Sequence, residues 1–448
     1  MIRQGQFKGY CPGNQEVRTK KHGKRLLSRE RMRYNAVNRK PKQEERAMKY
    51  DFETMLDRRG KDAYALDAIG RPGEAPGAPK EGFDVIPMWV ADMNFATCPA
   101  IQEAIIRRVN HPAFGYFLVS DAYYSAILRW QETRNGVQGL ERKHIGYENG
   151  VLGGVVSALN VLCSRGDPVL IQTPAYVGFT HMLENNGYRL VANPMKRDAG
   201  GTWRMDYEDM EEKIVRNRIH AAIFCNPHNP CGRVWTAEEI RKAMEIFQRH
   251  DVWVVSDEIW SDLLLNGSRH TPVQSVSEYA REHTAAFYAP SKTFNLAGLV
   301  GSYHIICNDW LRERQAKEAS LSMYNEMNVL SMHALTGAYS PEGAEWLEQL
   351  REVLSGNANY ACDMIGQRFP GVTVQKPEGT YMLFLDCEEW CRAHGQDLDA
   401  LLKAGTDVGV AWQDGRLFHD PWSIRMNLAL PLHKVQEAFD RLARYVFA

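Results

Sequence analysis

Short apolar runs alternate with amphipathic stretches through the middle of the chain. The runs at residues 168–172, 221–225, 252–256 and 284–288 are bounded by turn-forming residues, which predicts buried strands. The stretches at 149–164, 178–186 and 237–250 have apolar residues at helical spacing. Strands and helices in this alternation predict an α/β fold, with a mostly parallel sheet covered by helices on both faces.

The segments on either side of this alternation predict a second domain. Residues 70–82 are rich in glycine and proline and should form a loop, whereas residues 380–386 look like another strand. A chain of 448 residues is long enough for two domains. We expect a large domain at residues 95–335 and a smaller α/β domain that combines residues 50–94 with 336–448.

Residues 1–49 differ from the rest in charge, with 15 Lys and Arg against four Glu. The segment has little hydrophobic periodicity, so we interpret it as a disordered basic arm outside the fold. It is either a dispensable tail or a product of start-site choice, with Met48 as the alternative start. We expect no nucleic-acid partner.

The composition of the chain also bears on where the protein is located in the cell and on whether it binds a metal. No apolar run approaches the roughly 20 residues of a membrane helix, which predicts no membrane association. The nine cysteines are irregularly spaced and form neither a disulfide framework nor a metal-binding set. We therefore predict a cytoplasmic protein without a bound metal.

The predicted strands end in polar residues that could bind a ligand together. In the order of the chain, the four ends carry Tyr176, Asn229, Asp257 and Lys292. Ligands in parallel sheets bind beyond the carboxyl ends of the strands, so we expect these side chains to meet there. Lys292 should lie on a turn between two strands, where a desolvated lysine can attack a carbonyl carbon. The glycine-rich segment at 148–154 opens an apolar helix and can hold an anion.

The motifs at these positions resemble a known family. They are Asn-Pro-His-Asn-Pro-Cys-Gly at 226–232, Ser-Asp-Glu at 256–258, Ser-Lys-Thr-Phe-Asn-Leu-Ala-Gly at 291–298 and Ile-Arg-Met-Asn at 424–427. Together they resemble fold-type I pyridoxal-phosphate enzymes of aminotransferase class I/II. Met-Trp-Val-Ala-Asp-Met at 88–93 and Phe-Gly-Tyr at 114–116 look like the C–S lyase branch, the MalY/PatB type of cystathionine β-lyase. The resemblance extends from about residue 50 to the C-terminus.

This resemblance implies a pyridoxal 5′-phosphate site in a homodimer. Lys292 would hold the cofactor covalently and later act as the base at the substrate Cα, and Asp257 would pair with the pyridinium nitrogen. Arg425 would bind the carboxylate of an amino-acid substrate. The remaining contacts to the cofactor would be a hydrogen bond from Asn229, ring stacking by Tyr176, and phosphate binding by Ser291, the N–H groups of Val151 and Leu152, and Tyr116 of the neighbouring subunit.

Three positions depart from the family pattern. Trp260 stands where relatives carry a tyrosine or histidine three residues after the aspartate, so the hydrogen bonds around the 3′ oxygen should differ. Val300 replaces an arginine, and Ala289 replaces a serine that binds phosphate.

The expected reaction is β-elimination from a sulfur amino acid such as cystathionine, which yields a thiol, pyruvate and ammonia. Two alternatives stay open from the sequence. Transamination uses the same residues, and a cofactor-bound regulatory protein would use the fold for a partner interaction.

Overall fold

The computed structural model describes residues 48–73, 75–321 and 325–448. The basic arm predicted for residues 1–49 therefore lies almost entirely outside the described residues. Residues 50–448 form one compact unit, and their division into two domains stays a prediction.

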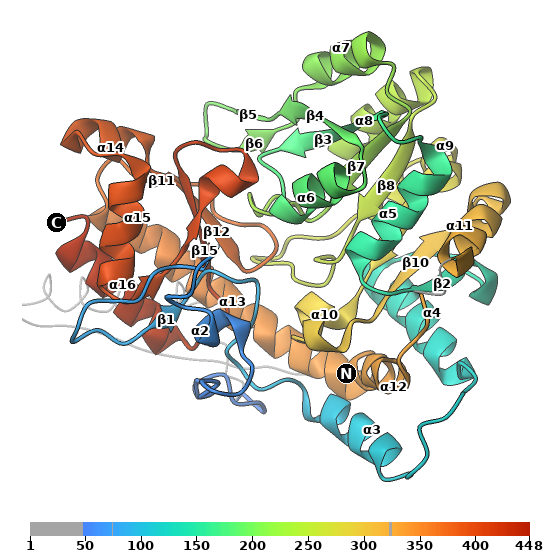
Figure 1. Ribbon diagram of the computed structural model, residues 1–448, viewed down its shortest axis with the longest axis horizontal. Helices are drawn as coiled ribbons and strands as arrows, with labels where there is room; N and C mark the ends of the chain where they lie inside the picture. The colour runs from blue at the N-terminus through green and yellow to red at the C-terminus, as the bar shows by residue number, and fades with distance from the viewer. Residues whose placement is uncertain (1–47, 74, 322–324) are drawn as a thin grey trace, which may run out of the picture. The chain divides into compact units, whose positions relative to one another are not determined.

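A seven-stranded sheet forms the centre of this unit, as Figure 1 shows. Its five parallel strands run in the spatial order β9, β8, β7, β3 and β4, and β10 is antiparallel to both β9 and β2. The predicted mostly parallel α/β sheet is thus confirmed. The strand bounds are β2 Ile145–Glu148, β3 Pro168–Thr173, β4 Arg189–Pro194, β7 Ala221–Cys225, β8 Trp253–Asp257, β9 Thr284–Tyr288 and β10 Ser302–Ile306.

Helices cover both faces of this sheet because alternate side chains of each strand point to opposite faces. On β3, Val169 and Ile171 pack with α5, α6 and α11, whereas Leu170 packs with α7 and α8. These helices span Val151–Leu162 (α5), Val177–Asn185 (α6), Tyr207–Asn217 (α7), Ala237–Arg249 (α8) and Asp309–Leu321 (α11). The predicted cap of α8 is present, since Thr236 and Glu239 form a capping box.

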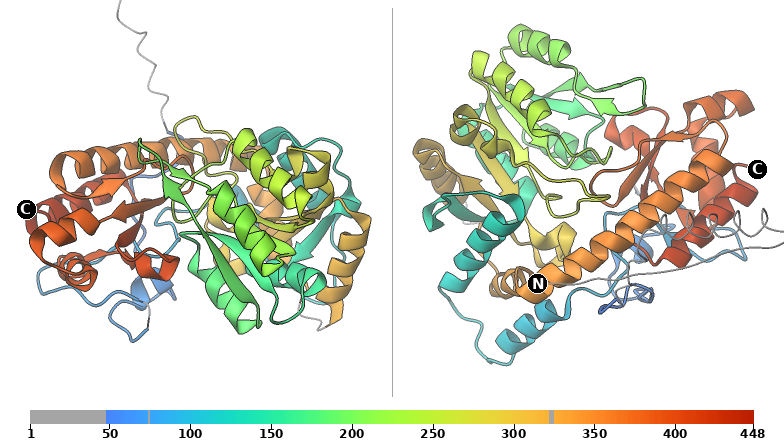
Figure 2. Two further views of the ribbon diagram at one scale, coloured as in Figure 1. Left: turned by 90° about the horizontal axis from the view of Figure 1, so that it is seen from above. Right: turned by 180° about the vertical axis from the view of Figure 1, so that it is seen from behind.

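A second, four-stranded sheet is built from the C-terminal part of the chain. Its antiparallel strands run in the order β11 (Thr373–Val374), β12 (Met382–Asp386), β15 (Ser423–Asn427) and β14 (Gln413–Asp414). The long helix α13 (Pro341–Arg368) runs across the back of this sheet in Figure 1 and lies in the foreground of the right panel of Figure 2. The N-terminal strand β1 (Ile86–Pro87) pairs with β13 (Val410–Ala411), so residues before the large sheet join residues far after it.

The other helices are α2 Tyr64–Asp67, α3 Pro99–Val109, α4 Asp121–Asn135, α9 Glu278–Glu282, α10 Pro290–Thr293, α12 Val329–Ala338, α14 Glu388–His394, α15 Leu398–Asp407 and α16 Leu432–Tyr445, and a two-stranded ribbon joins β5 (Lys196–Arg197) to β6 (Trp203–Arg204). Within the described ranges, every helix is too short or too polar to span a bilayer.

Candidate active site

A cavity of about 300 Å³ lies at the carboxyl ends of the parallel strands. The ends of β3, β7, β8 and β9 each contribute to its wall, which is the edge at which parallel sheets bind ligands. The residues that line it are Ala91, Asn149, Gly150, Val151, Leu152, Gly153, Tyr176, Cys225, Asn229, Asp257, Ile259, Trp260, Ser291, Lys292, Ala297, Val300, Gly301 and Ser302. The structure thus brings together the sequence-predicted site residues other than Tyr116 and Arg425 in one wall.

Lys292 lies on α10, a single helical turn that begins at Pro290, and not on the irregular turn expected from the sequence. Proline is favoured at the first position of a helix, which explains the start of this turn. The Lys292 amine donates a hydrogen bond to the carbonyl oxygen of Ala91 at 3.2 Å. Burial, and after it the nearby charge of Arg425, lower the pKa of Lys292 to about 8. The amine can therefore lose its proton near neutral pH, as a nucleophile or a base requires.

Asp257 is the last residue of β8. The sequence predicted that this strand ends at residue 256, so the observed strand extends one residue further and includes Asp257. Its carboxylate accepts a hydrogen bond from the Ile259 N–H at 3.0 Å, the one donor to it within the described residues. Burial raises the pKa of Asp257 to about 6. The backbone fixes this carboxylate because the Asp257 carbonyl accepts from Asn226 N–H, the first residue after β7. Among the described residues, no lysine or arginine forms a salt bridge with this buried carboxylate, and a protonated ring nitrogen would supply such a partner.

Asn229 and Arg425 lie side by side although 196 residues separate them. Arg425 Nη1 donates to the Asn229 side-chain oxygen at 3.1 Å. The amide nitrogen of Asn229 is therefore the atom left to donate into the cavity. Arg425 itself is buried in β15, behind the cavity wall. Burial lowers its pKa to about 10.

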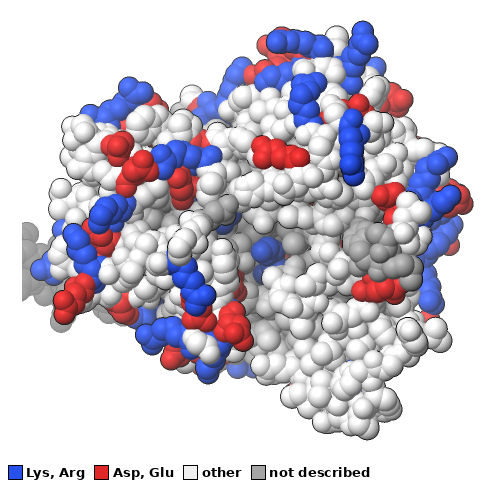
Figure 3. All heavy atoms as spheres, in the orientation of Figure 1, with Lys and Arg blue, Asp and Glu red and all other residues white. Residues whose placement is uncertain are grey.

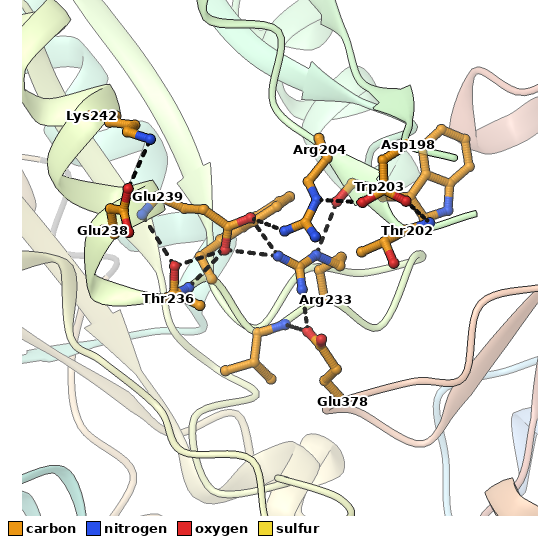
Figure 4. A network of polar contacts seen from close by, with 12 residues as sticks. Asp198, Thr202, Trp203, Arg204, Arg233, Thr236, Glu238, Glu239, Lys242 and Glu378 are labelled. Atoms are coloured by element: carbon orange, nitrogen blue, oxygen red, sulfur yellow. Dashed lines mark hydrogen bonds and ion pairs between the residues drawn. The ribbon is translucent and has the colours of Figure 1, made fainter. Parts of the chain in front are cut away.

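An ion-pair network holds the loop that carries Asn229, and Figure 4 shows this network around Arg233. Arg233, which is buried, contacts Glu239 Oε1 at 2.6 Å and Glu378 Oε2 at 2.5 Å. Glu378 also accepts from the Val234 N–H at 2.9 Å. Because Glu378 lies just before β12, this network joins the Asn229 loop to the sheet that carries Arg425.

The anion-binding end of the cavity is formed by the start of α5. Gly150 precedes the helix with a φ of 84°, a conformation that glycine adopts without strain. The N–H groups of Val151 and Leu152 are in the first turn, where a helix has no backbone acceptors for them. Ser291 lines the same cavity. Such an arrangement suits a phosphate group.

Tyr176 lines the cavity from the N-cap position of α6. Gly178 allows the ring to sit there, since a Cβ at Gly178 would lie 2.4 Å from the Tyr176 ring. Phe179 packs edge-on against the same ring, with 5.6 Å between centroids. The ring is thus held at the wall, where stacking on a flat ligand is possible.

Tyr116 is not part of this cavity. It lies between α3 and α4 and is fully exposed in the single chain.

The three departures from the family pattern do lie near the cavity. Trp260 lines it and packs edge-on against Tyr381 at 4.8 Å, whereas Val300 lines it with a φ of 46°, which is unusual for a β-branched residue. Ala289 is buried beside the lysine turn.

Three participants were not found from the sequence. They are the carbonyl oxygens of Ala91 and Trp89 and the side chain of Gln413, which hydrogen-bond to Lys292 or Arg425. The sequence does not indicate which backbone carbonyls will accept hydrogen bonds in a site, since every residue has one. Gln413 lies in no recognisable motif. Only the pairing of distant strands reveals these contacts.

Comparisons with known proteins place the chain in a family. The family described as "Aminotransferase class I and II" matches residues 84–442. The chain is 35% identical to cystathionine beta-lyase PatB of Bacillus subtilis over 80% of this chain and 92% of that protein. It is 31% identical to protein MalY of Escherichia coli, over 89% and 99% of the two chains. A PLP-bound C-S lyase from Staphylococcus hominis is similar in structure, with a TM-score of 0.80 and 29% identity over 89% and 98% of the chains.

The protein therefore belongs to the class I and II aminotransferase family. This confirms the resemblance inferred from the motifs, and the fold-type I architecture with it. The residues present fit pyridoxal phosphate. The cavity contains an amine of lowered pKa, a buried carboxylate that forms no salt bridge with the described residues, and a helix start that suits a phosphate.

Proposed function

We propose that this protein is a pyridoxal-phosphate-dependent C–S β-lyase that cleaves cystathionine or a related cysteine conjugate. The observation that carries the proposal is the single cavity that contains Lys292, Asp257 and Asn229, with Arg425 directly behind it. Similarity to a cystathionine beta-lyase and to a PLP-bound C-S lyase supports the same reaction. The products are a thiol, pyruvate and ammonia, and one water is consumed.

When bound, the cofactor supplies an electron sink for the negative charge that forms at the substrate Cα. Lys292 would hold the cofactor through its amine, and the free amine would take the proton from Cα. Its lowered pKa keeps a usable fraction of the amine neutral near pH 7. Asp257 keeps the ring nitrogen protonated, and Arg425 holds the substrate carboxylate so that the Cα–H bond faces Lys292.

The phosphate end and the ring face are served by the residues that the sequence suggested. Val151 and Leu152 donate backbone N–H groups, and Ser291 donates its hydroxyl. Asn229 donates from its amide nitrogen, and Tyr176 stacks on the ring. Trp260 cannot accept a hydrogen bond, so it contributes only packing to this wall.

The test measures two products from the same cofactor-loaded protein. Cystathionine alone should give pyruvate and a free thiol in equal amounts. Glutamate formed from 2-oxoglutarate, at a rate above that of pyruvate release, would favour transamination, which the family name supports as the second candidate. Cofactor binding without either product would favour a regulatory role.

The assembly is also proposed, as a homodimer in which Tyr116 reaches the phosphate site of the second copy. Tyr116, Phe114 and Leu118 are exposed on the segment after α3. Figure 3 shows that the face around α3 has few charged side chains, as expected of a surface that a second chain covers.

We further propose a cytoplasmic location, which the free thiols of all the described cysteines support.

A further inference from the structure

Among the described residues, neutral groups alone hold the buried charge of Arg425. Nη1 donates to Asn229 Oδ1, and Nη2 donates to the carbonyl oxygen of Trp89 and to the side-chain oxygen of Gln413. No carboxylate of the described residues pairs with Arg425, and Nε is buried without a partner. A buried guanidinium without a counter-charge is costly, so its position needs an explanation.

Sheet register fixes Gln413 beside Arg425. The two residues are direct cross-strand partners on β14 and β15, which places their side chains on the same face. Gln413 is buried, and the Arg425 guanidinium also lies over the Phe418 ring at 4.4 Å. The guanidinium is thus fixed in place by an amide oxygen, a carbonyl oxygen and an aromatic face.

The amide matters because a glutamate would have the same shape and a different charge. A carboxylate at this position would accept the same hydrogen bond and would neutralise Arg425 inside the protein. An amide orients the guanidinium and leaves its charge for an external ligand. Within the described residues, the other acceptors around Arg425 are also neutral, so this property does not depend on Gln413 alone.

We propose that Gln413 is a positioning residue that sets the affinity of the site for α-carboxylates by orienting Arg425 without neutralising it. The proposal rests on the proposed function, in which Arg425 binds the substrate carboxylate. It adds a residue that touches neither substrate nor cofactor. It also predicts that charge at position 413, more than its size, controls substrate binding.

The test compares three variants of the cofactor-loaded protein. Gln413→Glu adds the charge at nearly constant shape, and Gln413→Met removes the acceptor without adding charge. Gln131→Glu is the matched control, because Gln131 is a buried glutamine of α4 that bonds to Tyr303 outside the cavity. Calorimetry measures the binding of 3-(methylthio)propanoate, a thioether carboxylate without an amino group. Kinetics with cystathionine give KM and kcat, and absorbance reports the bound cofactor.

Gln413→Glu should weaken carboxylate binding by about 10- to 100-fold and raise KM to a similar extent, the range of a hydrogen-bonded charge. Gln413→Met should weaken it less, by about 3- to 10-fold. Cofactor absorbance should be unchanged in both variants, and Gln131→Glu should bind the probe as the wild type does.

Wild-type affinity in Gln413→Glu, or a loss equal to that of Gln413→Met, would overturn the proposal. If Gln413→Glu does not fold, an unchanged affinity in Gln413→Met overturns it as well. A wild-type protein that binds the carboxylate but releases no thiol from cystathionine contradicts the proposed reaction, and the variants then still decide the role of Gln413. A wild-type protein that releases thiol from cystathionine but does not bind the carboxylate overturns the role of Gln413 and leaves the proposed reaction standing.

Discussion

Replacing Lys292 with methionine should stabilise the cofactor-free protein. The amine is partly buried at the cavity wall and has one hydrogen-bond partner among the described residues, the Ala91 carbonyl. Burial and the charge of Arg425 lower its pKa from 10.5 to about 8. Methionine fills nearly the same space without a charge, so the folded state no longer bears the cost of that burial.

The size of this effect follows from the two pKa values and depends on pH. The unfolded chain keeps the lysine proton up to about pH 10.5, and the folded chain only up to about pH 8. The stability of the wild type therefore rises with pH between these values. Lys292→Met should gain at most about 3 kcal/mol in the free energy of unfolding at pH 7, and about 1 kcal/mol at pH 9.5.

Urea unfolding of the cofactor-free protein, followed by tryptophan fluorescence at both pH values, measures the two differences. Lys242→Met is the matched control, because Lys242 is an exposed residue that pairs with Glu238 on α8. Its stability should change by less than about 0.5 kcal/mol at either pH. The reasoning is refuted if Lys292→Met is no more stable than the wild type at pH 7, or if its gain is the same at pH 9.5.

Three further predictions concern the loaded enzyme. Borohydride treatment should fix the cofactor on Lys292, and Lys292→Ala should lose both fixation and turnover; peptide mapping that finds the label on another lysine would contradict the assignment. Asp257→Asn should lose roughly 100-fold or more in kcat while it still binds cofactor, since a neutral amide no longer favours a protonated ring nitrogen; near-normal rates would make the carboxylate structural. Arg425→Lys should raise KM for amino acids roughly 10- to 100-fold with unchanged cofactor absorbance, because lysine cannot bind a carboxylate through two parallel N–H groups; loss of cofactor at normal substrate affinity would count against this role.

The strands and the site residues at their ends were accessible from the sequence for a physical reason. Buried parallel strands consist of uninterrupted apolar residues, so β7 and β9 were predicted with the bounds that the structure has. The polar residue that follows each run then marks the ligand-binding edge. Local effects limited the accuracy to about one residue elsewhere, as at Asp257, which ends β8 itself. The helical turn at Lys292 was missed because four residues are too few for a periodic signal.

The environment of Arg425 was not accessible in the same way, since it depends on contacts between distant parts of the chain. The Trp89 carbonyl that accepts from Arg425 is 336 residues away in sequence. It reaches the guanidinium because β1 pairs with β13 and because the Asn427 N–H donates to the Met88 carbonyl. Gln413 is only 12 residues from Arg425, but its place beside the guanidinium follows from the antiparallel register of β14 and β15.

These neutral acceptors also connect Arg425 to Lys292. The uncompensated charge of Arg425 is one cause of the low pKa of Lys292, after burial. An internal carboxylate beside Arg425 would remove that influence, and the amine would then keep its proton to a higher pH. Gln413, Asn229 and the Trp89 carbonyl hold Arg425 without cancelling its charge. The same arrangement thus keeps the Arg425 cation available to bind a carboxylate and helps to keep the Lys292 amine neutral. Burying the two groups lowers the stability of the folded chain, and the site gains binding and reactivity in return.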